Sequence, residues 1–172
     1  QFNRKCQDLM QAKCDQLEEQ CVLVDPKKHG IDIRHVSPCF IQQKARAKHK
    51  QLDDCTLEEV RFISCLNVLN DSIHPIPGRS NTYNDIIKFF GRNKFLICAD
   101  LSSSYFQIWV HQRLWRFLGV MTPFRGIKLM TRLGQGLLNS DVELDQAMAQ
   151  VLGDEMTEGF CCVARDDLFI GG

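Results

Sequence analysis

The sequence predicts an α+β fold, in which helices pack on one face of an antiparallel sheet. Near the N-terminus, apolar residues recur at three- and four-residue steps, as on one face of an amphipathic helix. In the second half, short apolar runs bounded by turn residues predict strands. The chain has 172 residues, of which 44% are hydrophobic, so it is long enough to bury one core.

The first segment is predicted to be a helix from Phe2 to about Val24. Its apolar stripe consists of Cys6, Met10, Cys14, Leu17 and Cys21. The pair Asp25-Pro26 is expected to end this helix, because proline cannot donate a backbone hydrogen bond. We interpret residues 1–35 as an N-terminal helical or linker segment.

The middle of the chain alternates between loops and short elements. Residues 44–50 read KARAKHK and predict a solvated basic loop or hairpin. Arg61 to Leu69 alternates well enough for a strand. Pro75 and Pro77 predict an extended link, and Asn84 to Phe90 has the composition of a short helix.

The last third predicts strands and one longer helix. The predicted strands are the run Phe95 to Ala99, the pair Phe117 to Met121 and Ile127 to Thr131, and two strands within Phe160 to Ile170. Ser140 followed by Glu143 predicts a capping box for a helix that reaches about Met156.

Charge and cysteine content restrict the function classes. The 21 basic and 21 acidic side chains cancel, so a nucleic-acid partner would have to be held by local patches. The nine cysteines lack a CxxC pair, which favours reduced, partly buried thiols over a zinc site. No signal peptide or membrane-spanning run is visible, so we expect an intracellular protein. The ends, Gln1 and Gly171-Gly172, lead us to expect a fragment.

Three carboxylates lie at predicted strand ends. Asp166 and Asp167 form a charged tip between two apolar strands, and Asp100 follows the run Phe95 to Ala99. If the three are neighbours, their repulsion favours bound hard cations, and magnesium accepts carboxylate and phosphate oxygens. This pattern indicates a phosphoryl-transfer site with two ions. The alternative is an ordinary Asp-Asp hairpin turn.

The linear order of motifs resembles the reverse transcriptase family of LTR retrotransposons and retroviruses over about residues 37–172. The similar motifs are Ser37-Pro38, the basic run 44–50, Arg61-Phe62-Ile63 with Leu69-Asn70, Pro75-Ile76-Pro77, Asp100 to Ile108, Leu133 to Ser140, and Ala164-Arg165-Asp166-Asp167 in place of the family's Y-x-D-D box. The resemblance implies a right-hand polymerase fold, with fingers at 36–95, an incomplete palm at 96–172, and the thumb beyond the chain.

The same resemblance implies site roles. Asp100, Asp166 and Asp167 would be the catalytic ligands of two magnesium ions, which manganese could replace, and Asp167 is the least direct of them. Tyr105 corresponds to the aromatic gate that favours deoxynucleotides, with a plain core tyrosine as the alternative. Gln135 would contact the incoming nucleotide.

Other substrate contacts are implied by position. Gly136 would leave room for the template-primer, with a simple tight turn as the alternative. Arg61 would bind the nucleotide triphosphate through its forked donors. Lys44 would contact phosphate, although a solvated basic face is an equal alternative, and Lys48 and Lys50 compete for that role.

The implied reaction is RNA-directed DNA synthesis from deoxynucleoside triphosphates on an RNA or DNA template with a primer. Implied partners are the other parts of a pol polyprotein, namely thumb, RNase H and integrase, in the cytoplasm, a virus-like particle or the nucleus. Several residues depart from the family: Cys65, Asn67, Asp141, Ala164 and Arg165. These departures keep open an inactive remnant or nucleic-acid-binding module that retains the fold. Another two-metal enzyme, such as a nuclease, is a further alternative.

Overall fold

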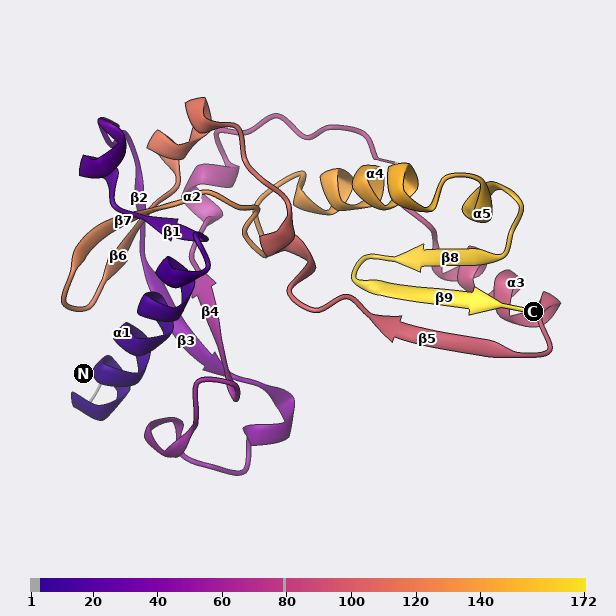
Figure 1. Cartoon of the computed structure of the whole chain (residues 1–172), viewed down its shortest axis with the longest axis horizontal. Helices are drawn as coiled ribbons and strands as arrows, with labels where there is room; N and C mark the ends of the chain where they lie inside the picture. Colours follow the sequence, from indigo (N-terminus) through magenta and orange to yellow (C-terminus); the bar gives the residue numbers. More distant parts are fainter. Residues whose placement is uncertain (1–3, 79) are drawn as a thin grey trace. The chain divides into compact units, whose positions relative to one another are not determined.

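The computed structural model describes residues 4–78 and 80–172 and has a mixed α+β architecture, as the sequence predicts (Figure 1). The chain divides into two compact units. Unit 1 contains the chain through Ile73 together with Trp109–Leu137, and unit 2 contains His74–Ile108 and Leu138–Gly172. The sequence-based boundary between residues 95 and 96 lies inside unit 2, and the assignment of fingers and palm stays a prediction.

In its described residues, unit 1 is built from two small sheets, two α-helices and several short 3-10 helices. Its helices and strands are α1 (Arg4–Glu19), β1 (Leu23–Val24), β2 (Val36–Ser37), β3 (Cys39–Gln43), β4 (Val60–Ser64), α2 (Asn67–Asn70), β6 (Gly119–Thr122) and β7 (Gly126–Met130). One sheet has the order β1-β7-β6-β2, and the other is the β3-β4 pair. The β2-β6 pairing is parallel, whereas the other strand pairs are antiparallel.

Helix α1 is part of the packing of unit 1. Cys14 and Leu17 are buried, as the predicted stripe requires, whereas Cys21 lies beyond the helix end and is exposed. The helix ends at Glu19, before Asp25-Pro26, so the predicted stop was wrong. The side chain of Asp25 instead caps a following 3-10 turn by accepting from the N–H of Lys27. Phe2, the predicted start, lies outside the described residues.

The β3-β4 hairpin has one buried and one outward face. Ile41 and Val60 belong to a buried cluster, against which Leu9 and Met10 of α1 pack. The predicted strand from Arg61 to Leu69 was correct only as far as Ser64. The chain leaves the sheet after Ser64, and the last part of the predicted strand forms helix α2 instead.

In its described residues, unit 2 contains one three-stranded sheet and three α-helices. Its helices and strands are α3 (Tyr83–Arg92), β5 (Leu96–Asp100), α4 (Ser140–Leu152), α5 (Asp154–Thr157), β8 (Cys161–Ala164) and β9 (Asp167–Gly171). The strand order is β5-β9-β8, with both pairs antiparallel (Figure 1). The ring of Phe90 in α3 contacts the ring of Phe169 in β9, with centroids 5.0 Å apart, so α3 packs on this sheet.

The helices of unit 2 begin and end differently from some predictions. The predicted Asn84 to Phe90 helix is confirmed as α3, and a capping box at its start joins Thr82 to Asp85. The predicted capping box at Ser140 was wrong, because Asn139 is the N-cap and its side chain bonds elsewhere. The predicted single helix is also broken at Gly153, whose φ is +45°.

Two predicted strand pairs are confirmed. β6 pairs with β7 around the Pro123 to Gly126 turn, and β8 pairs with β9 around the charged tip. All nine cysteines lie in the described part and are free thiols, as predicted. Among the described residues, no helix is both long and apolar enough to cross a membrane.

Candidate functional site

The candidate site is centred on the hairpin turn between β8 and β9. Ala164 pairs with Asp167, which leaves Arg165 and Asp166 as the two turn residues. Arg165 has a φ of +61°, a left-handed conformation that two-residue hairpin turns require and that usually favours glycine. The turn therefore places a long cationic side chain, 75% exposed, directly before the two aspartates.

Asp100 lies directly opposite Asp167. The two are register partners at the end of the β5-β9 pairing. The N–H of Leu101 donates to the carbonyl oxygen of Asp166 over 2.8 Å, so the adjacent Asp100/Asp167 pair is the closely spaced, non-hydrogen-bonded type. Side chains that lie opposite each other project from the same face, so these two carboxylates share one side of the sheet.

Magnesium prefers oxygen ligands such as carboxylates. The carboxylates of Asp100 and Asp167 project from the same side of the sheet. The backbone connects Asp166 to the same strand ends through its bond to Leu101. Within residues 4–78 and 80–172, however, no group of three or more His, Cys, Asp or Glu side chains is gathered closely enough to hold an ion. The strand pairing therefore brings Asp100 and Asp167 opposite each other, and a metal site formed by all three aspartates stays a prediction.

Tyr105 lies in a contact with Asp141 that the sequence did not predict. Its hydroxyl donates to Oδ1 of Asp141 over 2.5 Å. Burial of the ring and this bond to a carboxylate raise the pKa of the Tyr105 hydroxyl, and the charge of Asp166 adds to the effect. Tyr105 sits in the 3-10 helix η4 (Ser104–Gln107), and Asp141 in the first turn of α4.

Arg165 also points to Asp141. Its Nε lies 4.0 Å from Oδ2 of Asp141, the oxygen not used by Tyr105. The pair is weak by itself because both side chains are more than half exposed. Asp141 is nevertheless the residue that contacts both the tyrosine helix and the aspartate turn.

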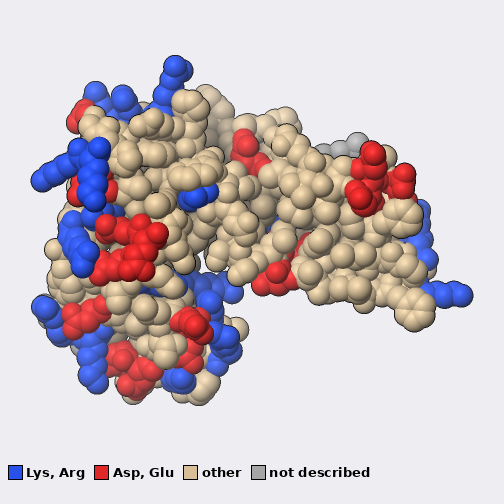
Figure 2. Space-filling model, viewed as in Figure 1, with Lys and Arg blue, Asp and Glu red and all other residues tan. Residues whose placement is uncertain are grey.

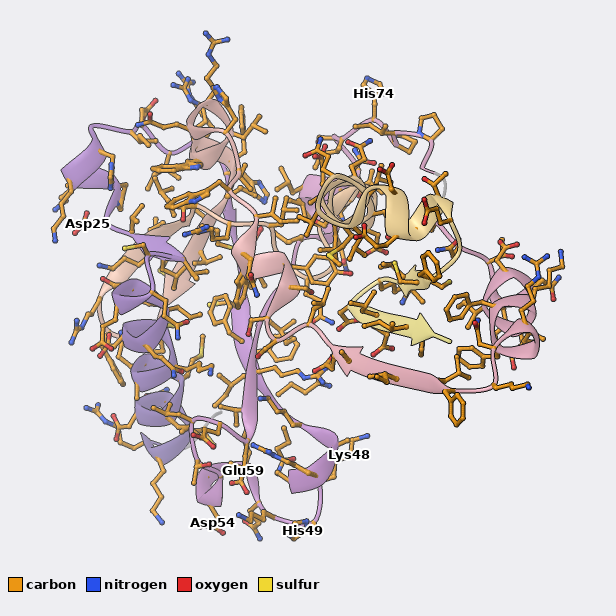
Figure 3. The ribbon with its side chains drawn as sticks, turned by 45° about the vertical axis from the view of Figure 1, so that its right-hand side comes forward. Asp25, Lys48, His49, Asp54, Glu59 and His74 are labelled. Atoms are coloured by element: carbon orange, nitrogen blue, oxygen red, sulfur yellow. The ribbon has the colours of Figure 1, made fainter. Side chains whose placement is uncertain are left out.

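The start of α4 is fixed by Asn139. Its amide donates to the carbonyl oxygen of His74 and accepts from the N–H of Ile76, each over 2.9 Å. Figure 3 labels His74 on the extended segment beside this helix start. Asn139 has a φ of +72°, a conformation that asparagine tolerates better than most residues. Asp141 therefore lies in the first turn of a helix whose start is held in place by the bonds of Asn139.

The remaining substrate-binding candidates lie in unit 1. Arg61 is exposed on β4 and pairs in register with Gln42, on the face opposite the buried Val60. Its position leaves the guanidinium open to solvent. Arg61 lies in a strand, as predicted, and its role in binding a triphosphate stays a prediction.

The basic loop is more structured than predicted. Nζ of Lys50 contacts Oε1 of Glu59 over 2.7 Å, and Arg46 donates to the carbonyl oxygen of Glu58. Figure 3 labels Lys48, His49 and Glu59 around this loop. Lys44 is half-buried and Lys48 is exposed. Lys50 is thus engaged internally, which leaves Lys44 and Lys48 as the lysine candidates for phosphate.

In Figure 2, Lys and Arg (blue) are interspersed with Asp and Glu (red) over unit 1, whereas the visible face of unit 2 is mostly uncharged. This distribution agrees with a formal net charge of zero. Any nucleic acid would therefore be bound by particular side chains rather than by a general basic field.

Gln135 and Gly136 form the centre of a tight turn. The N–H of Leu137 donates to the carbonyl oxygen of Gly134, and Gly136 has a φ of +85°, as a type II turn requires of its third residue. Asn70 donates to the carbonyl oxygen of Gly136 over 2.9 Å and anchors the turn. The positive φ that this turn requires explains why residue 136 is a glycine. Gln135, the preceding residue, is exposed.

Sequence reasoning missed Asp141 and Asn139 as site residues. Asp141 was noted only as a departure that suits a helix N-terminus, and it lies 36 positions from its partner Tyr105. The one available signal was this departure from the family pattern. Asn139 lay within the Leu133 to Ser140 motif but was given no role of its own.

Comparison with known proteins gives a match of structure only. No family model and no curated protein matches this sequence. Among solved structures, the native protease-reverse transcriptase of prototype foamy virus is similar over 100% of this chain and 20% of that chain, with a TM-score of 0.74 and 20% identity.

Two further foamy viral structures are similar over the whole of this chain. The protease-reverse transcriptase in complex with an RNA/DNA hybrid has a TM-score of 0.75 at 19% identity, with 20% of that chain covered. The dRH form in complex with double-stranded DNA has a TM-score of 0.69 at 17% identity, with 26% covered. The chain thus spans about a fifth to a quarter of these proteins and shares the fold of a region of the foamy virus protease-reverse transcriptase.

Proposed function

We propose that this chain is the fingers and part of the palm of a retroelement reverse transcriptase, an RNA-directed DNA polymerase. It would add deoxynucleotides to a primer 3'-hydroxyl on an RNA or DNA template. The observation that carries the proposal is the facing pair Asp100 and Asp167 beside the Asp166 turn. The pair lies in a fold shared along its whole length with a solved reverse transcriptase region.

Asp100, Asp166 and Asp167 would hold two magnesium ions, which manganese could replace. When bound, such ions activate an attacking hydroxyl and stabilise the leaving oxygen in an in-line displacement. The protein would contribute position rather than a covalent intermediate: Tyr105 would support the incoming sugar, and Gln135 with Gly136 would line the nucleotide and template-primer path.

Arg61 and Lys44 would contact phosphates. A guanidinium suits a triphosphate because its donors form a planar fork. Two of the solved relatives contain an RNA/DNA hybrid or double-stranded DNA, which supports nucleic-acid binding by this chain as part of the proposal. The thumb, RNase H and integrase would belong to the same polyprotein.

The test is primer extension on a poly-rA template by the intact protein that contains this chain, with magnesium. We expect extension by the parent and at most a trace with Asp166→Asn. Glu158→Gln is the matched control, because it also removes one exposed carboxylate of unit 2 and should extend normally. Extension by Asp166→Asn at the parent's rate would refute the proposed metal site.

The second candidate function is a non-catalytic nucleic-acid-binding module with the same fold. It is favoured by Arg165 in the turn and by the side-chain arrangement, in which three carboxylates are not gathered. In the same assay, an inactive parent that is activated by Arg165→Ala would indicate a sound fold blocked by this cation. A parent and an Arg165→Ala variant that both bind an RNA/DNA hybrid without extending it would favour the binding module.

A further inference from the structure

Three separate segments of unit 2 meet at Asp141. Tyr105 comes from η4, Arg165 from the β8-β9 turn, and Asp141 from the first turn of α4. One oxygen of the carboxylate accepts from the tyrosine hydroxyl, and the other faces the guanidinium. A single side chain thus joins the aromatic residue to the turn that carries Asp166 and Asp167.

We propose that Asp141 is a positioning residue, which holds the ring of Tyr105 against the aspartate turn and thereby sets how strongly the site rejects a ribose 2'-hydroxyl. The inference rests on the proposed function, because it assigns the sugar preference of that same site. Asp141 need not touch the nucleotide. It acts through the orientation of Tyr105.

The physical argument is the rigidity of the ring. A partly buried tyrosine without a partner for its hydroxyl can turn about its side-chain torsions and can yield to an extra oxygen atom on the sugar. A hydrogen bond to a charged acceptor holds the ring more firmly than one to a neutral acceptor. Because Asn139 anchors the start of α4 through His74 and Ile76, the acceptor itself does not move freely.

The first experiment measures sugar selection by the intact protein on poly-rA, as the ratio of kcat/KM for dTTP to that for UTP. Asp141→Ala should lower this ratio about tenfold, the effect of losing one hydrogen bond to a charged group. Tyr105→Phe should lower it similarly, because only the hydroxyl is removed. In the double variant, the ratio of kcat/KM values should be no lower than in either single variant, because both substitutions remove the same hydrogen bond.

Two controls separate positioning from a general effect. Glu143→Gln removes a carboxylate from the same first turn of α4 and should keep the parent's ratio. Asp141→Asn keeps an acceptor for the tyrosine and should restore much of the selection lost in Asp141→Ala. An active Asp141→Ala variant with the parent's ratio would overturn the inference while leaving the proposed function intact.

A second readout does not depend on activity. In the intact protein, subtracting the ultraviolet titration of Tyr105→Phe from that of the parent isolates the Tyr105 hydroxyl, and Asp141→Ala is compared with its own Tyr105→Phe double variant in the same way. Above the ordinary tyrosine pKa of about 10, the bond to Asp141 should keep Tyr105 more protonated than a tyrosine without this bond, and Asp141→Ala should increase its ionised fraction. Equal ionised fractions of Tyr105 in the parent and in Asp141→Ala would show that Asp141 does not hold the tyrosine hydroxyl. A parent that anchors the tyrosine but extends no primer would instead refute the proposed function, and the sugar-selection role with it.

Discussion

Asp100 and Asp167 face each other across the β5-β9 pairing, at its closely spaced position. Like charges placed directly opposite in a sheet destabilise it. We therefore expect Asp167→Asn to raise the free energy of unfolding of the metal-free protein by about 0.5 kcal/mol. Urea unfolding in the presence of a chelator measures this change.

Added magnesium should reverse the order of stability. A cation held by the folded state stabilises the parent, and Asp167→Asn should lose most of that gain. Glu158→Gln, which lies outside the pair, should respond to magnesium as the parent does. The proposed ion site is contradicted if magnesium stabilises the parent and Asp167→Asn equally.

A second prediction concerns Lys128 in β7, whose side chain is only 8% exposed. Its Nζ contacts Glu18 Oε2 over 2.9 Å and lies 3.9 Å from Asp25. Lys128→Met should reduce the free energy of unfolding by about 2 kcal/mol, because it leaves the partly buried carboxylate of Glu18 without its cation. Adding Glu18→Gln should recover part of the loss. Additive losses would show that the two side chains do not interact in solution.

A third prediction concerns pH. Bonds from Lys50 and from the N–H of Thr56 lower the pKa of Glu59 from 4.5 to about 2. A carboxyl group whose pKa is lower in the folded protein stabilises it above the unfolded pKa, and the contribution is lost as pH falls. The stability difference between the parent and Glu59→Gln should thus be full above pH 4.5 and disappear towards pH 2.

Thermal unfolding across this pH range provides the measurement. Glu58→Gln is the control, because Glu58 is the exposed neighbour in sequence and should differ little from the parent. A Glu59→Gln difference that does not change between pH 4.5 and 2 would rule out this ion pair as its source.

A fourth prediction compares two glycines. Gly136 has a φ of +85° in its turn, so Gly136→Ala should destabilise by about 1 kcal/mol. Gly91 lies in helix α3, and an added Cβ would meet nothing within 4 Å. Gly91→Ala should therefore stabilise by about 0.5 kcal/mol. Chemical denaturation of both variants should give opposite signs; the same sign in both would contradict the turn geometry.

The sequence predicted best those elements whose partners are adjacent in the chain. The β6-β7 and β8-β9 pairs each join two short apolar runs across a tight turn, so local pattern was enough. The placement of Asp100 beside them needed long-range pairing with β9, which the apolar run Phe95 to Ala99 made plausible without fixing its register.

The incorrect predictions have physical causes that local pattern does not contain. Ser140 has the residue type of an N-cap, but the side chain of Asn139 bonds to the segment at His74 and shifts the helix start. The apolar pattern after Ser64 fits a strand or a helix equally, and tertiary packing decided for α2. The Tyr105 to Asp141 bond joins residues too distant in sequence for any periodicity to indicate.

Strand β5 has a consequence for handling the protein. It is an edge strand of the β5-β9-β8 sheet, and Leu96 and Ile97, on its two faces, are 43% and 63% exposed. An uncovered, apolar edge offers its free backbone groups to another copy of the same strand. The isolated chain should consequently aggregate at high concentration, and a lysine in place of Ile97 would be the simplest way to improve its solubility.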